Sequence, residues 1–104
     1  MANYNVSGLI TLAELAKIKK PFWYVYILKC ADNTYYTGIT NNIEKRIAYH
    51  ENGRGAKYTK GRGPFKLVFQ ESHPDRSRAS QREREIKKLS LTQKKHLIEL
   101  PKLL

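Results

Sequence analysis

Two tyrosine-rich segments separated by a short turn constrain the fold of this chain most strongly. Residues 22–29 and 34–40 are dense in β-branched and aromatic side chains, a composition that favours strands. The connection between them, Ala31-Asp32-Asn33, is typical turn material, and its shortness predicts an antiparallel hairpin. Strand alternation divides the first segment into two faces, one with Tyr24, Tyr26 and Leu28 and the other with Trp23, Val25 and Ile27.

The segments after the hairpin predict a helix and a third strand. Asn41 is expected to cap the helix, with Glu44 three residues further on completing a box-like start. This helix is expected to end near Glu51, because the glycine-rich stretch 53–55 follows. Residues 65–70 have the composition of the third strand.

Two further helices complete a small α+β domain. The first is expected over about 75–89, and the second follows the capping-box pattern of Ser90 to Gln93 and ends near Leu100. The order β-β-α-β-α-α indicates a small antiparallel sheet covered by helices. No internal repeat and no second domain is visible, so residues 22–100 are expected to form one domain.

Residues 1–21 are expected to form an N-terminal helical extension to that domain. The stretch from Thr11 to Glu14 has the pattern of a capping box, and an apolar stripe follows it. Pro21 then ends the helix, because the residue before a proline disfavours helical geometry. A helix that covers a sheet edge or part of the core is favoured over a chemical role.

The charge balance of the chain indicates a polyanionic partner. Lysine and arginine total 20 against 9 acidic residues, which gives a formal charge of +11. Nucleic acid, with DNA favoured, is the partner that such an excess indicates, and an anionic membrane surface is the lesser option. The longest apolar run, residues 22–28, is far too short to span a membrane, and the N-terminus lacks a signal-peptide pattern. We therefore expect a cytoplasmic protein without a membrane partner.

One carboxylate, Glu83, lies on the inward-facing stripe of its expected helix. It follows Ala79 by four residues and precedes Ile86 by three, so the three side chains share a face. A carboxylate in that position must be paired, bind a metal or lie at the edge of a cleft. The spacing leaves a functional role and a structural salt bridge equally open, the latter with Arg82, Arg84 or Arg46.

Arg46 and His50 are four residues apart on the helix after Asn41, so their side chains are neighbours. A guanidinium there can clamp a phosphate, and an imidazole can orient a phosphate or a water or transfer a proton. Each residue also has a simpler explanation. Arg46 is then a surface charge, and His50 is a C-terminal helix residue favoured by the dipole.

Tyr26 and Tyr36 lie on the two paired strands, where cross-strand neighbours are close. A phenol has a pKa of about 10, so a free tyrosine is a poor base at neutral pH unless a cation or a metal-bound water is near. Cross-strand aromatic packing is the simpler explanation of the pair, and composition alone favours it over a catalytic role.

The glycine-rich loop 53–63 and the helix after Asp75 carry much of the positive charge. Their contacts to phosphates would position a nucleic acid without reading its sequence, and Tyr58 could stack on a base. Exposure to solvent is the simpler explanation for each lysine or arginine alone, but it does not explain the total formal charge of +11. The side chains expected to bind nucleic acid are Arg54, Lys57, Tyr58, Lys60, Arg62 and Arg82.

Taken in order along the chain, these residues resemble the GIY-YIG nuclease family. The resemblance extends from Trp23 to about Leu97, and it is closest to the small stand-alone URI-like branch, of which Ala56-Lys57-Tyr58-Thr59 is typical. The two triplets differ slightly from the family's, because Tyr24 replaces the first glycine of GIY and Thr37 replaces the isoleucine of YIG. The matching positions are Tyr24-Val25-Tyr26, Tyr36-Thr37-Gly38, the helix arginine Arg46, the metal-binding glutamate Glu83, and His50, which some branches contain.

The resemblance implies a metal-dependent endonuclease with a shallow site over a three-stranded antiparallel sheet. Glu83 would hold one divalent cation, Mg²⁺ or Mn²⁺, with water and substrate phosphate as the other ligands. Tyr26 would position or deprotonate the attacking water with help from Tyr36, Arg46 would stabilise the transition state, and His50 would take a secondary part. A non-catalytic nucleic-acid-binding module is the main alternative, and a basic adaptor for an acidic protein surface is a remote one.

Overall fold

The two tyrosine-rich segments form an antiparallel hairpin of strands β1 (Trp23–Lys29) and β2 (Tyr35–Thr40), as predicted. The structure is a computed structural model and describes residues 22–100. Asn33 closes the turn with a φ of 67°, a left-handed conformation that asparagine tolerates better than most residues. The third strand, β3 (Lys66–His73), pairs antiparallel with the other side of β1. The strand order is therefore β2-β1-β3, with β1 in the centre.

Within residues 22–100, three α-helices accompany the sheet: α3 (Ile43–Glu51), α4 (Arg76–Lys87) and α5 (Leu91–Glu99). A short 3₁₀ helix, η1 (Lys57–Thr59), lies in the glycine-rich loop. The order β-β-α-β-α-α and the α+β fold class are thus confirmed. The capping box predicted before the last helix is present, with Ser90 and Gln93 each bonding the other's backbone.

Two local predictions were wrong at the element ends. The N-cap of α3 is Asn42 and not Asn41, because the Asn42 side chain accepts the Lys45 N–H at 3.1 Å. Helical geometry starts one residue late because the Thr40 hydroxyl, at the end of β2, bonds the Asn42 N–H. The third strand also runs beyond residue 70, since its pairing with β1 continues to His73 opposite Trp23.

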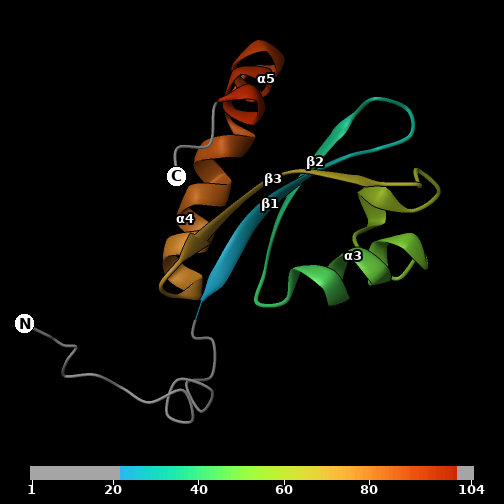
Figure 1. Cartoon of the computed structure of the whole chain (residues 1–104), viewed down its shortest axis with the longest axis horizontal. Helices are drawn as coiled ribbons and strands as arrows, with labels where there is room; N and C mark the ends of the chain where they lie inside the picture. The colour runs from blue at the N-terminus through green and yellow to red at the C-terminus, as the bar shows by residue number, and fades with distance from the viewer. Residues whose placement is uncertain (1–21, 101–104) are drawn as a thin grey trace, which may run out of the picture.

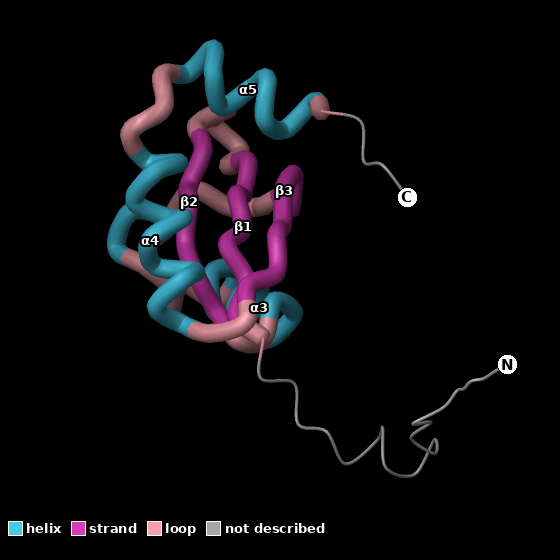
Figure 2. The backbone as a smooth tube through the Cα atoms, turned by 90° about the vertical axis from the view of Figure 1, so that its left-hand side faces the viewer, coloured by secondary structure: helices cyan, strands magenta, loops and turns pink. Residues whose placement is uncertain are grey.

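Helices cover both faces of the sheet. Figure 1 shows α4 on one side of the strands and α3 on the other, and in Figure 2 α4 runs beside β2 while α5 crosses above the end of the sheet. The core lies on the α4 face, where Val25 and Ile27 pack against Ala79 and Ile86, all fully buried. The other face of β1 is therefore left for Tyr24, Tyr26 and Leu28, as the alternation predicted.

The helix predicted over residues 1–21 lies outside the described residues. Within residues 22–100, no helix is both long and apolar enough to cross a lipid bilayer.

Candidate active site

The two strands of the hairpin bring Tyr26 and Tyr36 together on the α3 face of the sheet. Their ring centroids are 6.3 Å apart, and the Tyr26 side chain is 1% exposed. Gly38 is the register partner of Tyr26 on β2, and a Cβ there would lie 2.7 Å from the Tyr26 hydroxyl. Only a glycine at this position leaves room for the phenol without displacing it.

A chain of hydrogen bonds runs from Tyr26 into the glycine-rich loop. The Tyr26 hydroxyl is 2.8 Å from His50 Nε2, and His50 Nδ1 is 2.7 Å from Thr59 Oγ1. The Thr59 hydroxyl donates to the Ala56 carbonyl at 2.8 Å, so its oxygen is free to accept the Nδ1–H of His50. This order leaves Nε2 as an acceptor, and the Tyr26 O–H donates to it.

Burial holds both members of the Tyr26–His50 pair in their neutral forms. It lowers the pKa of His50 from 6.5 to about 4, with the positive charge of Arg46 acting in the same direction and Glu51 opposing it. Burial also raises the pKa of Tyr26 to about 12, although Arg46 opposes this shift and Tyr36 and Glu83 add to it. A neutral, buried imidazole is not the charged C-terminal histidine that the helix dipole would favour.

The depressed pKa of His50 predicts that acid destabilises the fold. The unfolded chain takes up this proton near pH 6.5 and the folded chain only near pH 4, so the stabilisation is complete above 6.5 and is lost as pH falls towards 4. The loss amounts to about 3 kcal/mol. Urea unfolding between pH 7.5 and 4 should show this slope in the wild type and a smaller slope in His50→Asn. Equal slopes in the wild type and His50→Asn would contradict this role of His50. The control is His96→Asn, which replaces an exposed histidine and should leave the slope unchanged.

Arg46 and Glu83 act on the Tyr26 phenol from different helices. Arg46 extends from α3, and its guanidinium interacts with the Tyr26 hydroxyl. Glu83 extends from α4, has a side chain that is 20% exposed, and forms an ion pair with Lys87, whose Nζ is 3.1 Å from its Oε2. Its charge acts on Tyr26 as well. The structural partner of this carboxylate is therefore a lysine one turn away and none of the three arginines considered from sequence.

The side chains predicted to bind nucleic acid divide into three groups. Arg54, Lys57 and Lys60 are exposed around the loop. Tyr58 is 42% exposed and stacks on Tyr36 at 6.0 Å between centroids. The two remaining arginines are engaged with carboxylates, Arg62 with Asp32 and Arg82 with Glu71 and Glu85.

Arg82 lies on the opposite face of the sheet from Tyr26. Its partner Glu71 is the register neighbour of Val25, whose side chain points towards α4. Two carboxylates hold the pKa of Arg82 above its usual value although burial acts against them. The structure therefore does not bring Arg82 to the phenols.

Sequence reasoning missed two residues that shape the site, Thr59 and Gly55. Thr59 is 1% exposed and bonds His50, and a Cβ on Gly55 would lie 2.2 Å from His50 Nδ1. The loop was interpreted as a phosphate-binding surface, but it also encloses the imidazole. The sequence feature that pointed to this part of the loop was the Ala56-Lys57-Tyr58-Thr59 segment. It did not indicate which of its side chains faces the site.

The residues present fit a single divalent cation held by one carboxylate. Among residues 22–100, no group of three histidine, cysteine, aspartate or glutamate side chains is arranged to enclose a metal ion. Mg²⁺ often needs no such group, because one or two carboxylates, waters and substrate phosphates complete its shell. Glu83, half-buried beside the phenols, has the chemistry of that lone protein ligand.

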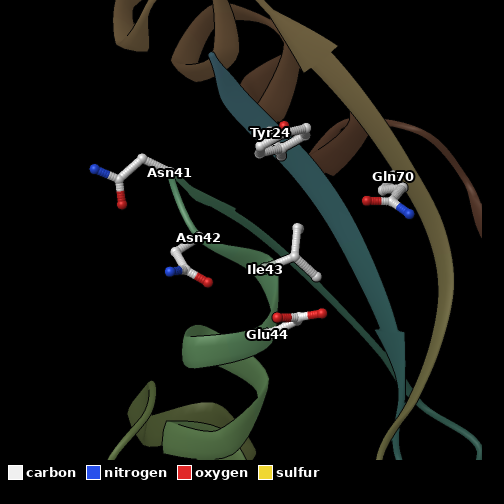
Figure 3. Close-up of a pocket in the computed structure, with 6 residues that line it drawn as sticks. All are labelled: Tyr24, Asn41, Asn42, Ile43, Glu44 and Gln70. Atoms are coloured by element: carbon white, nitrogen blue, oxygen red, sulfur yellow. The ribbon is translucent and has the colours of Figure 1, made fainter. Parts of the chain in front are cut away.

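A separate hollow of about 290 Å³ lies on the same sheet face at the first turn of α3 (Figure 3). Tyr24 of β1 and Gln70 of β3 form one side, and the start of α3 forms the other. The charged residue in its lining is Glu44, and the rest are neutral: Tyr24, Asn41, Asn42, Ile43 and Gln70. This hollow suits neutral polar groups and does not favour a phosphate.

Comparisons with known proteins cover the part of the chain that forms the site. The model of the GIY-YIG catalytic domain matches residues 22–96. The UPF0213 protein CPE1444 of Clostridium perfringens is 60% identical over 75 residues, which are 72% of this chain and 81% of that protein. The range matched by the family model includes β1, β2, α3 and α4.

Two solution NMR structures are similar to the described fold. That of the UPF0213 protein BH0048 from Bacillus halodurans is 47% identical with a TM-score of 0.51, covering 76% of this chain and 84% of that one. That of the protein EF2693 from E. faecalis is 35% identical with a TM-score of 0.54, covering 75% and 83%. The names of these relatives state no activity.

Proposed function

The chain belongs to the GIY-YIG catalytic domain family, and from this membership we propose that it is a metal-dependent endonuclease that hydrolyses phosphodiester bonds, foremost in DNA. Residues 22–100 act as the nuclease domain in this proposal, and residues 1–21 are an extension to it. One observation carries the proposal. Side chains from β2, α3 and α4 act on a single buried phenol of β1, and they are Tyr36, Arg46, His50 and Glu83 around Tyr26.

Tyr26 is proposed to transfer the proton of the attacking water. Its pKa of about 12 makes a resting phenolate unfavourable, so we do not infer a preformed base. Instead, a water at the phenol oxygen gives its proton to that oxygen while the phenol proton moves to His50 Nε2. The hydroxide so formed attacks phosphorus, the P–O bond to the leaving oxygen breaks, and the leaving oxygen takes a proton from solvent. His50 is neutral at physiological pH, so Nε2 has a free lone pair for this proton. Its low pKa makes it a weak base, so it holds the proton only transiently and passes it on to solvent.

Arg46 is proposed to stabilise the charge that develops on the phosphate, while Tyr36 assists Tyr26. A guanidinium forms strong, paired hydrogen bonds to phosphate oxygens, and these strengthen as negative charge grows. Glu83 would hold the Mg²⁺ or Mn²⁺, which when bound supplies Lewis-acid stabilisation of the phosphoryl and leaving oxygens. The protein's own part is then to hold the phosphate between α3 and the phenols and to move one proton.

Lys87 is expected to compete with a metal ion for Glu83. Its ammonium contacts the carboxylate at 3.1 Å, and an ion pair of this exposure is worth about 0.5–1 kcal/mol. Lys87→Gln should therefore tighten Mn²⁺ binding about 2- to 5-fold, measured without nucleic acid by electron paramagnetic resonance of free Mn²⁺. Lys88→Gln, the same change at the exposed neighbour, controls for net charge. Equal tightening in both variants would show that Lys87 does not compete at Glu83.

The experiment that tests the proposed function is a cleavage panel with the wild-type protein. Labelled single-stranded, duplex, flapped and branched DNA and RNA are each incubated with Mg²⁺, Mn²⁺ or EDTA, and binding is measured in the same mixtures. Metal-dependent cutting supports the nuclease and names its substrate class. A domain of this size has little surface for sequence readout, so we expect cutting selective for structure or for single strands.

The other outcomes favour the alternatives. Tight binding that weakens steeply with salt, without cutting under any metal, favours the non-catalytic binding module, which needs only the basic loop and helices. Weak binding that is insensitive to salt favours the basic adaptor for an acidic protein.

A further inference from the structure

A cavity of about 270 Å³ at the β2 edge has no part in the proposed mechanism. It lies where the last residue of α4 and the first turn of α5 meet the edge strand of the sheet. Tyr36 belongs both to this cavity and to the phenol pair of the candidate active site. The cavity therefore adjoins the place where the phosphodiester would react. Its lining is Tyr35, Tyr36, Thr37, Tyr58, Lys87 and Lys94.

The charge of this cavity is suited to a phosphate group. The two charged residues among its lining, in the part of the chain that the structure describes, are Lys87 and Lys94. The hollow beside Tyr24 in Figure 3 is of similar size, but Glu44 is its charged residue. Because Lys87 is paired with Glu83, Lys94 supplies the net positive charge of this cavity. Of the two hollows, an anion is therefore attracted to the one at the β2 edge.

The aromatic wall of the cavity is held in place before any ligand binds. Tyr58 stacks on Tyr36 with an interplanar angle of 26°, and the Arg62 guanidinium lies 4.5 Å from the Tyr58 ring centroid. Arg62 is in turn ion-paired with Asp32 in the hairpin turn. Tyr58 nevertheless remains 42% exposed, so part of its surface is available to a ligand. Because these side chains are already ordered, they lose little conformational entropy when a ligand binds.

From these observations we infer that the cavity is a nucleotide subsite, which takes the nucleotide next to the bond that is cut. Its phosphate binds Lys87 and Lys94, and its sugar or base lies against Tyr58. Lys87 then turns from Glu83 towards the phosphate and leaves the carboxylate free. The inference rests on the proposed function, because it places this nucleotide relative to the reacting phosphate. It gives α5 a part in binding the substrate.

Binding of a short labelled DNA strand in EDTA tests the subsite, because nothing is cut without metal. The double variant Lys87→Gln/Lys94→Gln is compared with Lys88→Gln/Lys95→Gln, which removes the same charge from the exposed neighbours. We expect the first to weaken binding about tenfold more than the second and to lower the slope of log affinity against log salt by about 1 to 2. Tyr58→Leu should weaken binding about tenfold with an unchanged slope.

Equal losses in the two double variants would overturn the subsite, because the lysines would then contribute only net charge. Failure of the subsite and failure of the nuclease proposal are distinguishable. If the wild type cuts in the cleavage panel but both double variants lose the same affinity, only the subsite proposal is wrong. If the two double variants lose different affinity but the wild type cuts nothing, the cavity binds nucleotides and the nuclease proposal is wrong.

Discussion

Replacing Glu83 with glutamine is expected to slow cleavage about 10³-fold or more and to leave nucleic-acid affinity unchanged or higher. Glutamine keeps the size of the side chain but removes the charge that would hold the cation. Several kcal/mol of transition-state stabilisation then disappear, and each 1.4 kcal/mol is about tenfold in rate. Binding should not fall, because the change removes a negative charge from a chain of formal charge +11.

The matched control for this variant is Glu85→Gln on the same helix. Glu85 is 56% exposed and pairs with Arg82, on the α4 side away from the phenols. Its replacement should leave the single-turnover rate within about twofold of the wild type, as surface changes usually do. A Glu83→Gln variant that cuts at a tenth of the wild-type rate or faster would show that this carboxylate does not hold a catalytic metal.

Tyr26→Phe is expected to slow cleavage about 10²- to 10⁴-fold, the range typical for loss of a proton-transfer group. The variant removes the one oxygen that connects an attacking water with His50 Nε2. It also leaves a buried imidazole nitrogen without its donor, which should cost about 1–3 kcal/mol of stability. Rates must therefore be compared at a temperature where circular dichroism shows both proteins folded.

Tyr24→Phe serves as the control for the loss of a phenol. Tyr24 is on the same strand and the same face, two residues before Tyr26, and lines the hollow at the start of α3. Its rate should stay close to that of the wild type. If both tyrosine variants slow cleavage equally, the effect comes from the sheet surface in general and the proton path through His50 is wrong.

Periodicity and capping patterns predicted the fold because they depend on neighbouring residues. The alternation of residues 22–29 correctly placed Val25 and Ile27 on one face and Tyr26 on the other, and the structure shows that the first face is the core. Ser90 and Gln93 were readable as a capping box because the motif is contained in four consecutive residues. The order of motifs likewise indicated the GIY-YIG family, and the comparisons confirm this.

Partners distant in sequence were the features that local patterns could not predict. Thr59 is nine residues from His50, across a glycine-rich loop without periodicity, so nothing local indicated their hydrogen bond. Arg62 and Arg82 were counted as free positive charge, yet each lies against carboxylates from other elements. Such pairings follow from how the loop and strands meet, which residue spacing does not encode.

The most direct test of the account measures cutting and binding together, under single-turnover conditions, for the wild type, Glu83→Gln and Tyr26→Phe. The substrate is the best-cut member of the panel, and each reaction runs with Mg²⁺ or EDTA. We predict that all three proteins bind the substrate and that only the wild type with metal cuts it at an appreciable rate. Wild-type cleavage rates in both variants would contradict the account, because the site built around Tyr26 and Glu83 would then not carry the reaction.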